Sequence, residues 1–404
     1  MILSKIKKIP GGINAVRGFK SAGINCGIKD DDKKDLMLIL TDNLAVAAGV
    51  FTTNRIKASS VIETSRRVKK GVVKAIIANS GNANACTGKK GKENTLEIME
   101  FTGKNLNVLG ENILVASTGI IGRLLEVNKI KKGIISLIKK IDSGNYSGTA
   151  EAIMTTDTFI KEIAVEVKMK NGSIRIAGIA KGAGMICPNM ATMLSFIVTD
   201  AKIKKNILQK TLRSAVDKSF NMITIDGCMS TNDMVLVLAN GMAESAEIKK
   251  DSSELKIFKK GLEYVSGELA KMIVLDGEGA TKLIKISVSG AKTKKSAKVA
   301  AMAIANSNLV KTAFFGEILN WGRITAALGA SGIELFPGNI DINFNGRKIV
   351  KNGCRFSYDE KEIKNILKEK EITIKVNLKQ GKEDAVVLTS DLSYEYIRIN
   401  ASYN

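Results

Sequence analysis

Residues 181–196 read Lys181-Gly-Ala-Gly-Met-Ile-Cys-Pro-Asn-Met-Ala-Thr-Met-Leu-Ser-Phe196, a glycine-rich loop that runs into an apolar segment. Thr192 ends the loop and stands at the start of a predicted strand that includes 195–199. A threonine in this place has two interpretations. It is a hydroxyl satisfied by backbone hydrogen bonds, or it is a nucleophile that becomes a chain terminus when the Ala191–Thr192 bond breaks. The pattern alone favours the first interpretation, so features elsewhere in the chain are needed to choose between the two.

The segments on both sides of this stretch alternate between strand and helix patterns. Residues 160–167 and 173–180 predict two strands, and Asn171-Gly172 between them is a strong hairpin signal. Residues 204–219 have the apolar spacing of an amphipathic helix. This mixture of hairpins and helices predicts an α/β fold, with α+β layers in which helices cover mixed β-sheets.

The remaining elements follow the same alternation. Buried strands are predicted at 35–40, 72–78, 113–116, 234–239, 282–289, 371–378 and 384–389. Helices are predicted at 59–70, 92–106, 126–140, 252–271, 296–307 and 358–370, and a hairpin turn at Asn345-Gly346. No internal repeat or linker divides the 404 residues, which are enough for one large or two medium domains.

The chain contains no histidine, and this absence narrows the chemistry more than any other feature. It excludes Ser-His-Asp catalysis, Cys-His catalysis and histidine metal sites. The five cysteines are far apart and form no C-x-x-C pair, which argues against a disulfide framework and a zinc cluster, so we expect no metal. A base at neutral pH must then be a carboxylate, a lysine, a cysteine or an amine terminus.

The formal net charge is +22, from 62 basic and 40 acidic side chains. Such a charge suggests nucleic acid as a partner, but the lysines are spread along the whole chain and no arginine-rich segment occurs. An anionic small substrate fits the charge as well. No run of 18 apolar residues is present, and the charged start at 1–8 has no apolar signal core behind it. We therefore predict a cytoplasmic protein that binds neither membrane nor nucleic acid.

If Thr192 is a nucleophile, the missing histidine also indicates its base. A threonine hydroxyl needs a base, and the most economical one is the α-amine that cleavage of the Ala191–Thr192 bond would release. An α-amino group has a pKa of about 7.7–8.0, so a useful fraction is neutral near pH 7–8. In self-cleavage the Thr192 hydroxyl would attack the Ala191 carbonyl, and water would open the resulting ester.

Several other residues are candidates for the same chemistry. Thr118-Gly119 follow a predicted strand and could supply the two oxyanion donors that acyl transfer needs, although a plain turn explains them too. Glu278, between two glycines, could receive a substrate ammonium, and Lys181 could receive a carboxylate. The small-residue loop at 79–87 lacks the Gly-Lys-Ser/Thr ending of a phosphate loop, which excludes nucleotide binding there.

Taken together, these stretches resemble the ornithine acetyltransferase (glutamate N-acetyltransferase) family of arginine biosynthesis. The matching stretches span nearly the whole chain in family order: 48–55, 79–88, 116–122, 154–158, 181–194, 224–227, 230–233, 276–282, 303–307, 315–317, 320–323 and 396–401. The resemblance implies a fold related to the self-cleaving β-aminopeptidases. It also implies cleavage between Ala191 and Thr192 into an α chain, 1–191, and a β chain, 192–404, which remain one intertwined unit, usually as an α2β2 heterotetramer.

The resemblance also implies roles for individual residues. Thr192 matches the nucleophile, and Thr118 and Gly119 match the oxyanion-hole pair. The positions that match substrate contacts are Thr155, Lys181, Thr192, Glu278 and Asn400. The implied reaction is ping-pong: N-acetylornithine acylates Thr192, ornithine leaves, and glutamate takes the acetyl group. No cofactor is expected. Some members of the family also accept acetyl-CoA as a donor, and the sequence leaves this open.

The sequence departs from the family pattern in two places. Ile318-Leu319 stand where the family commonly has an acidic residue and a proline. The sequence ends at Asn404, so the terminal hydroxyl residue that contacts substrate in the family is absent or replaced. Two other classes stay open beside the acetyltransferase. One is a related self-cleaving aminopeptidase or amidohydrolase that passes the acyl group to water, and the other is a nucleic-acid binder suggested by charge alone.

Overall fold

The computed structural model describes residues 5–187 and 193–402, so Ala191 and Thr192 lie outside the described residues. The chain divides into two compact units. Unit 1 comprises Met1–Gly182, Asn189–Asn221 and Cys228–Ile273, and unit 2 comprises Ala183–Pro188, Met222–Gly227 and Val274–Asn404. The predicted fragments 1–191 and 192–404 are products of bond cleavage, so this division by packing does not test them.

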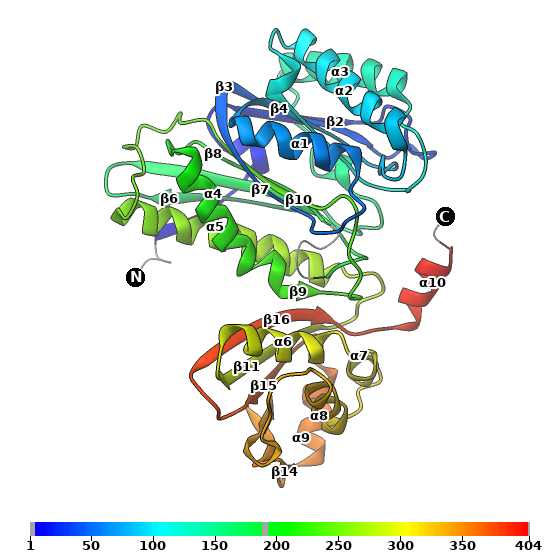
Figure 1. Cartoon of the computed structure of the whole chain (residues 1–404), viewed down its shortest axis with the longest axis vertical. Coiled ribbons are helices and arrows are strands. Elements are labelled where there is room, and N and C mark those ends of the chain that lie inside the picture. Colours follow the sequence, from blue (N-terminus) through cyan, green and yellow to red (C-terminus); the bar gives the residue numbers. More distant parts are fainter. Residues whose placement is uncertain (1–4, 188–192, 403–404) are drawn as a thin grey trace. The chain divides into compact units, whose positions relative to one another are not determined.

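Unit 1 is built on a nine-stranded sheet among the described residues, with the order β1-β6-β7-β8-β10-β3-β4-β5 and β2 paired to β3 (Figure 1). The strands are β1 (Ile6–Ile9), β2 (Phe19–Ile24), β3 (Leu36–Phe51), β4 (Val72–Asn79), β5 (Ile113–Ser117), β6 (Lys161–Lys168), β7 (Ser173–Lys181), β8 (Leu194–Thr199) and β10 (Met234–Ala239). Parallel and antiparallel pairs both occur, so the sheet is mixed, as predicted.

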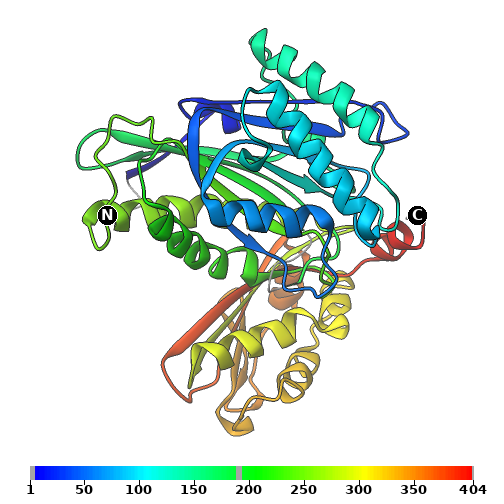
Figure 2. The ribbon, with the colours of Figure 1, turned by 45° about the horizontal axis from the view of Figure 1, so that its top comes forward.

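Helices cover both faces of this sheet. The helices are α1 (Ser59–Lys70), α2 (Gly88–Asn105), α3 (Val127–Asp142), α4 (Lys205–Asp217) and α5 (Ser253–Leu275). Buried residues alternate between the faces of β4: Ile76 belongs to the core that contains Val61 of α1, and Ile77 to the core that contains Ile134 of α3. Figures 1 and 2 show α2 and α3 side by side over the β2–β5 end of the sheet. The alternation is what a strand with two covered faces requires.

Unit 2 contains a second mixed sheet of seven strands in the described residues, with the order β14-β13-β12-β15-β11-β16-β9. The strands are β9 (Ile223–Thr224), β11 (Leu283–Ala291), β12 (Asp341–Phe344), β13 (Arg347–Lys351), β14 (Cys354–Arg355), β15 (Glu371–Asn377) and β16 (Glu383–Ser390). The helices are α6 (Lys294–Ala305), α7 (Asn308–Phe315), α8 (Trp321–Gly329), α9 (Glu360–Lys368) and α10 (Tyr394–Ser402).

The helices α6, α7, α8 and α9 share one apolar core with this second sheet. In β15 the residues Ile372, Ile374 and Val376 are buried, whereas Glu371 and Lys375 are exposed, so the strand buries one face only. Both predicted hairpins are present, as β6–β7 around Asn171-Gly172 and β12–β13 around Asn345-Gly346. The α/β fold with helices on mixed sheets is therefore confirmed.

Candidate functional site

Three of the predicted site residues lie together in unit 1. Lys181 ends β7, Thr118 follows β5, and Thr155 lies in the loop before β6. The Lys181 ammonium donates to the Thr155 hydroxyl at 2.6 Å and to the Thr118 hydroxyl at 3.4 Å. Lys181 and Thr118 are almost fully buried, with 4% and 5% of their surfaces exposed. Residues that are 26 and 63 positions from Lys181 thus meet at one cation.

The turn after β5 is held close to the loop that follows β4. The Thr118 N–H donates to the Asn79 carbonyl at 3.0 Å, and the Ile120 N–H donates to the Gly81 carbonyl at 3.3 Å. Gly119 has φ of 130°, and a Cβ placed on it would come within 2.3 Å of the Gly81 carbonyl carbon. Only glycine fits this backbone, both sterically and conformationally. A closely packed turn with a hydroxyl beside it is a suitable oxyanion site because its donors cannot move away.

Asp157, a residue with no predicted role, organises the backbone around Lys181. Its carboxylate accepts from the Thr155 N–H at 2.9 Å, from the Gly182 N–H at 2.7 Å and from the buried Lys161 ammonium at 2.6 Å. Burial works to raise the pKa of Asp157, but the charges of Lys181 and Lys161 outweigh it and lower that pKa to about 2. The sequence signal for this role was the place of Asp157, two residues after Thr155, because an acid buried at a site has to be paired with a cation or with hydrogen-bond donors.

We expect Asp157→Asn to lower the stability of unit 1 at neutral pH. The substitution removes the charge that faces Lys161 and Lys181, and breaking a buried pair typically costs about 3–5 kcal/mol. Because the folded-state pKa of Asp157 lies below the ordinary value of 3.8, its contribution is present above about pH 4 and is lost as pH falls toward about 2.

Urea unfolding of both proteins at pH 7, 5, 4 and 3 measures this prediction. The difference in free energy of unfolding between wild type and Asp157→Asn should be constant from pH 7 to 5 and should narrow by pH 3. Protonation of Asp157 in the wild type removes a stabilisation on the order of 2 kcal/mol in total. A gap that is absent at pH 7, or that widens in acid, would contradict the paired, ionised state of Asp157.

Two further predicted residues lie together in unit 2. Asn400, in α10, donates its amide to the Glu278 carboxylate at 2.8 Å. The Glu278 N–H donates to the Ala183 carbonyl at 2.9 Å, and a Cβ on Gly184 would come within 2.4 Å of the Glu278 carboxylate. The Glu278 carboxylate occupies the space that a side chain at position 184 would need. This explains why the second glycine of the 181–196 stretch is a glycine.

The loop that carries Glu278 is tied to the C-terminal segment of the same unit. The Asp391 carboxylate accepts from the Thr281 N–H at 2.8 Å and from the Lys282 N–H at 2.9 Å. The Ser393 hydroxyl donates to the Gly279 carbonyl at 2.6 Å. These bonds fix the backbone on the C-terminal side of Glu278, so the Glu278 carboxylate lies on a loop with a fixed conformation.

The predicted nucleophile and its cleavage partner, Thr192 and Ala191, lie outside the described residues. The next described residue in the chain is Met193, whose N–H donates to the Asp233 carboxyl at 3.0 Å. Met193 directly precedes β8, so the strand that begins after the predicted nucleophile is as the sequence predicted.

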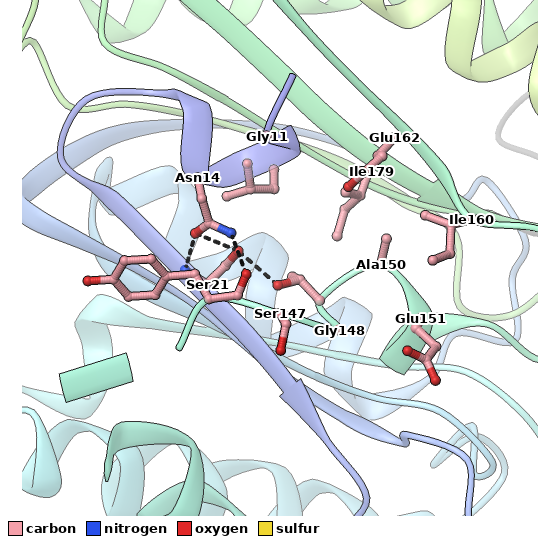
Figure 3. A pocket seen from close by; sticks show the side chains of 13 residues that line it. Gly11, Asn14, Ser21, Ser147, Gly148, Ala150, Glu151, Ile160, Glu162 and Ile179 are labelled. Atoms are coloured by element: carbon pink, nitrogen blue, oxygen red, sulfur yellow. Dashed lines mark hydrogen bonds between the residues drawn. The ribbon is translucent and has the colours of Figure 1, made fainter. Parts of the chain in front are cut away.

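A cavity of about 250 Å³ in unit 1 is lined by none of the predicted site residues. Figure 3 shows it between Asn14, Ser21 and the segment 147–151. Its polar groups satisfy one another: the Asn14 side-chain oxygen accepts from the Ser21 hydroxyl at 3.1 Å, and Ser21 in turn accepts from Thr149 at 2.8 Å. The cavity is thus separate from the cluster around Lys181.

No helix within residues 5–187 and 193–402 combines the length and the apolar character needed to cross a bilayer. The α/β fold and the cluster around Lys181 favour one class, the acyl-transfer enzymes, because hydroxyl and backbone donors on a fixed turn can stabilise an oxyanion. Comparisons with known proteins narrow this class.

A model of the ArgJ family matches residues 20–404. The arginine biosynthesis bifunctional protein ArgJ of Caldanaerobacter subterraneus is 48% identical over 98% of this chain and 99% of its own. ArgJ 1 of Clostridium acetobutylicum is 46% identical over 97% of both chains. A crystal structure of the ArgJ protein of Bacillus halodurans matches with a TM-score of 0.51 and 42% identity, over 52% of this chain and 100% of the solved chain.

The chain belongs to the ArgJ family and is a transferase of arginine biosynthesis. The family resemblance inferred from the sequence is therefore confirmed. The roles of the individual site residues are a separate matter, and they rest on the geometry described above.

Proposed function

We propose that this enzyme transfers an acetyl group from N-acetylornithine to glutamate through an acetyl ester on Thr192. The relatives named above are bifunctional proteins of arginine biosynthesis, and membership of their family supports this activity. The observation in this chain that carries the proposal is the cluster of Lys181, Thr118 and Thr155 beside the closely packed Gly119 turn. It offers fixed donors to an oxyanion and a cation to a substrate carboxylate.

The proposed reaction begins with self-cleavage of the Ala191–Thr192 bond. The Thr192 hydroxyl attacks the Ala191 carbonyl, the C–N bond breaks, and water opens the ester to leave a free α-amine on Thr192. That amine then serves as the base for each later turnover, a role that no histidine can take in this chain. The crystal structure of the Bacillus halodurans relative supports a divided chain, because the solved chain covers about half of this one, as a cleavage product would.

In each turnover the Thr192 hydroxyl attacks the acetyl carbonyl of N-acetylornithine, and the α-amine takes the hydroxyl proton. Thr118 and Gly119 stabilise the tetrahedral oxyanion, and losing one such donor typically costs about 10²–10³ in rate. The proton passes to the departing amine of ornithine, which leaves the acetyl ester behind. The amino group of glutamate then attacks this ester and restores Thr192.

The proposed substrate contacts are Thr155, Lys181, Thr192, Glu278 and Asn400. Hydrogen bonds between opposite charges are strong, so the Lys181 ammonium suits an anionic group of the substrate and the Glu278 carboxylate a cationic one. We propose that the cleaved chains, 1–191 and 192–404, assemble as an α2β2 heterotetramer in the cytoplasm. No cofactor is required, and acetyl-CoA is proposed as a second possible donor to glutamate.

The alternative within the self-cleaving enzymes is a hydrolase that passes the acetyl group to water. Incubation with N-acetylornithine, with and without glutamate, separates the two. The acetyltransferase should release ornithine in amounts that rise with glutamate and match the N-acetylglutamate formed. Steady ornithine release that is unchanged by glutamate would instead establish hydrolysis. A parallel assay with acetyl-CoA and glutamate tests the second donor.

A further inference from the structure

Asn232 and Asp233 occupy a buried position that the proposed mechanism does not use. They lie immediately before β10, and only 4% and 1% of their surfaces are exposed. β8 and β10 are parallel neighbours, with Leu194 opposite Met234, so both strands begin at the same edge of the sheet. The two residues therefore stand beside the start of β8, the strand that follows the predicted nucleophile.

The Asn232 amide holds the turn that carries the predicted oxyanion pair. It donates to the Ser117 carbonyl at 2.7 Å and to the Ala83 carbonyl at 2.7 Å, which uses both of its N–H bonds. Ser117 directly precedes Thr118. The Ala83 N–H donates to the Ile120 carbonyl at 2.9 Å, and Ile120 directly follows Gly119. Asn232 thus fixes the backbone on both sides of the Thr118–Gly119 pair.

The orientation of this amide is itself fixed. The Thr231 hydroxyl donates to the Asn232 side-chain oxygen at 2.5 Å. The Asn232 N–H donates to the Ser230 hydroxyl at 3.0 Å, which closes a local turn. A carboxylate in place of the amide would have no donor for the two carbonyls, so aspartate cannot replace asparagine here.

The Asp233 carboxyl holds the backbone of Met193, the residue that follows the predicted nucleophile. One of its oxygens accepts the Met193 N–H at 3.0 Å, and Met193 follows Thr192 in the chain. The second oxygen is buried and has no hydrogen-bond partner among the described residues. Burial raises the pKa of Asp233 well above its ordinary value.

We propose that Asn232-Asp233 is a positioning element, in which Asn232 sets the Thr118–Gly119 turn and Asp233 sets the start of β8 after Thr192. Neither residue reacts. The dipeptide aligns the nucleophile with the oxyanion donors, and a misplacement of about 1 Å between such groups can cost about 10²-fold in rate. This inference rests on the proposed function, because it assigns a purpose to the alignment of those groups.

The same pair of strands supplies matched controls at its opposite end. Asn240 directly follows β10, and its amide donates to the Arg17 carbonyl at 2.8 Å. Asp200 follows β8, where its buried carboxylate accepts from Arg17 at 2.9 Å and from the Arg175 N–H at 2.7 Å. Asn240→Ala and Asp200→Ala therefore remove comparable buried hydrogen bonds from the same strands, away from the predicted reacting residues.

The test compares Asn232→Ala, Asp233→Ala and Asp233→Asn with the two controls and the wild type. Each protein is followed for the rate of self-cleavage by intact mass, for kcat and KM of acetyl transfer, and for Tm. Asn232→Ala should lower kcat by about 10- to 100-fold with KM little changed, and Asp233→Ala should slow cleavage by about 10-fold or more. Asp233→Asn should behave like the wild type because its amide oxygen still accepts the Met193 N–H.

The controls should lower Tm without lowering kcat or the cleavage rate. If Asn232→Ala does not fold, Thr231→Val is the substitute variant. It keeps the side-chain volume but removes the hydroxyl that orients the Asn232 amide, and it should still lower kcat. Control variants that lose kcat as much as Asn232→Ala would overturn the proposal, and so would Asp233→Asn that fails to cleave. A wild-type protein that neither cleaves nor transfers acetyl groups would refute the proposed function instead.

Discussion

Thr192→Ala is expected to leave the chain as a single uncut species without acetyltransferase activity. The substitution removes the hydroxyl that attacks the Ala191 carbonyl, so no new α-amine forms. It also removes the side chain proposed to carry the acetyl group between the two substrates. Loss of a nucleophile in an acyl-transfer enzyme typically costs about 10⁶ in kcat, so any residual activity should be below detection.

Two substitutions control this result. Thr192→Ser keeps a hydroxyl and should restore cleavage and some transfer. Thr199→Ala removes a buried threonine at the other end of β8, whose hydroxyl accepts the Ala201 N–H at 3.2 Å, and it should remain cleaved and active. An active Thr192→Ala enzyme would show that another group carries the acetyl chemistry.

Gly119→Ala is expected to have the second-largest effect. The added methyl would lie 2.3 Å from the Gly81 carbonyl carbon and 2.5 Å from the Asn82 nitrogen, both backbone atoms that cannot move aside locally. The turn must shift, and with it the N–H proposed as an oxyanion donor. We expect a loss of kcat of about 10²–10³, the usual cost of one such donor.

Gly122 lies three residues further along the same turn and is a matched control. It also has positive φ, of 86°, but a Cβ there would meet nothing within 4 Å. Gly122→Ala therefore carries the conformational strain without the collision, and it should keep most of the activity. Equal losses in both variants would mean that strain in the turn, and not the position of Gly119, limits the reaction.

The elements that the sequence predicted well are those with a continuous apolar run and clear ends. The strand at 234–239 coincides with β10, and the hairpin at Asn345-Gly346 joins β12 to β13. By contrast β3 runs through Leu36–Phe51, well beyond the predicted 35–40. Asp42 and Asn43 are exposed polar residues inside it, and the pairing with β4 shifts register between Leu40 and Ala45, so the local pattern resembles the end of a strand.

The short helices α7, α8 and α10 were not predicted. Each has eight or nine residues, too few for a clear helical period. The signals that could have found two of them are their caps: the Ser307 hydroxyl accepts the Val310 N–H, and the Asn320 side chain accepts the Arg323 N–H. The tail at 396–404 gave no such signal, although α10 carries Asn400 to Glu278.

The candidate site could be predicted residue by residue but not as an arrangement. The family resemblance indicated Thr118, Thr155 and Lys181, but the hydrogen bonds that join them connect segments far apart in the sequence, and only the folded chain shows them. Asp157, Asn232 and Asp233 lie in stretches that match the family, but no local pattern in the sequence indicates which groups they bond. Their roles depend on backbone groups that long-range folding places beside them, and such partners cannot be inferred from local pattern.

Intact mass spectrometry of the purified, active wild-type protein tests the central claim most directly. We expect two fragments, Met1–Ala191 and Thr192–Asn404, that remain together in a native separation and carry the activity. An enzyme that transfers acetyl groups at full rate while showing only the uncut chain of 404 residues would contradict it.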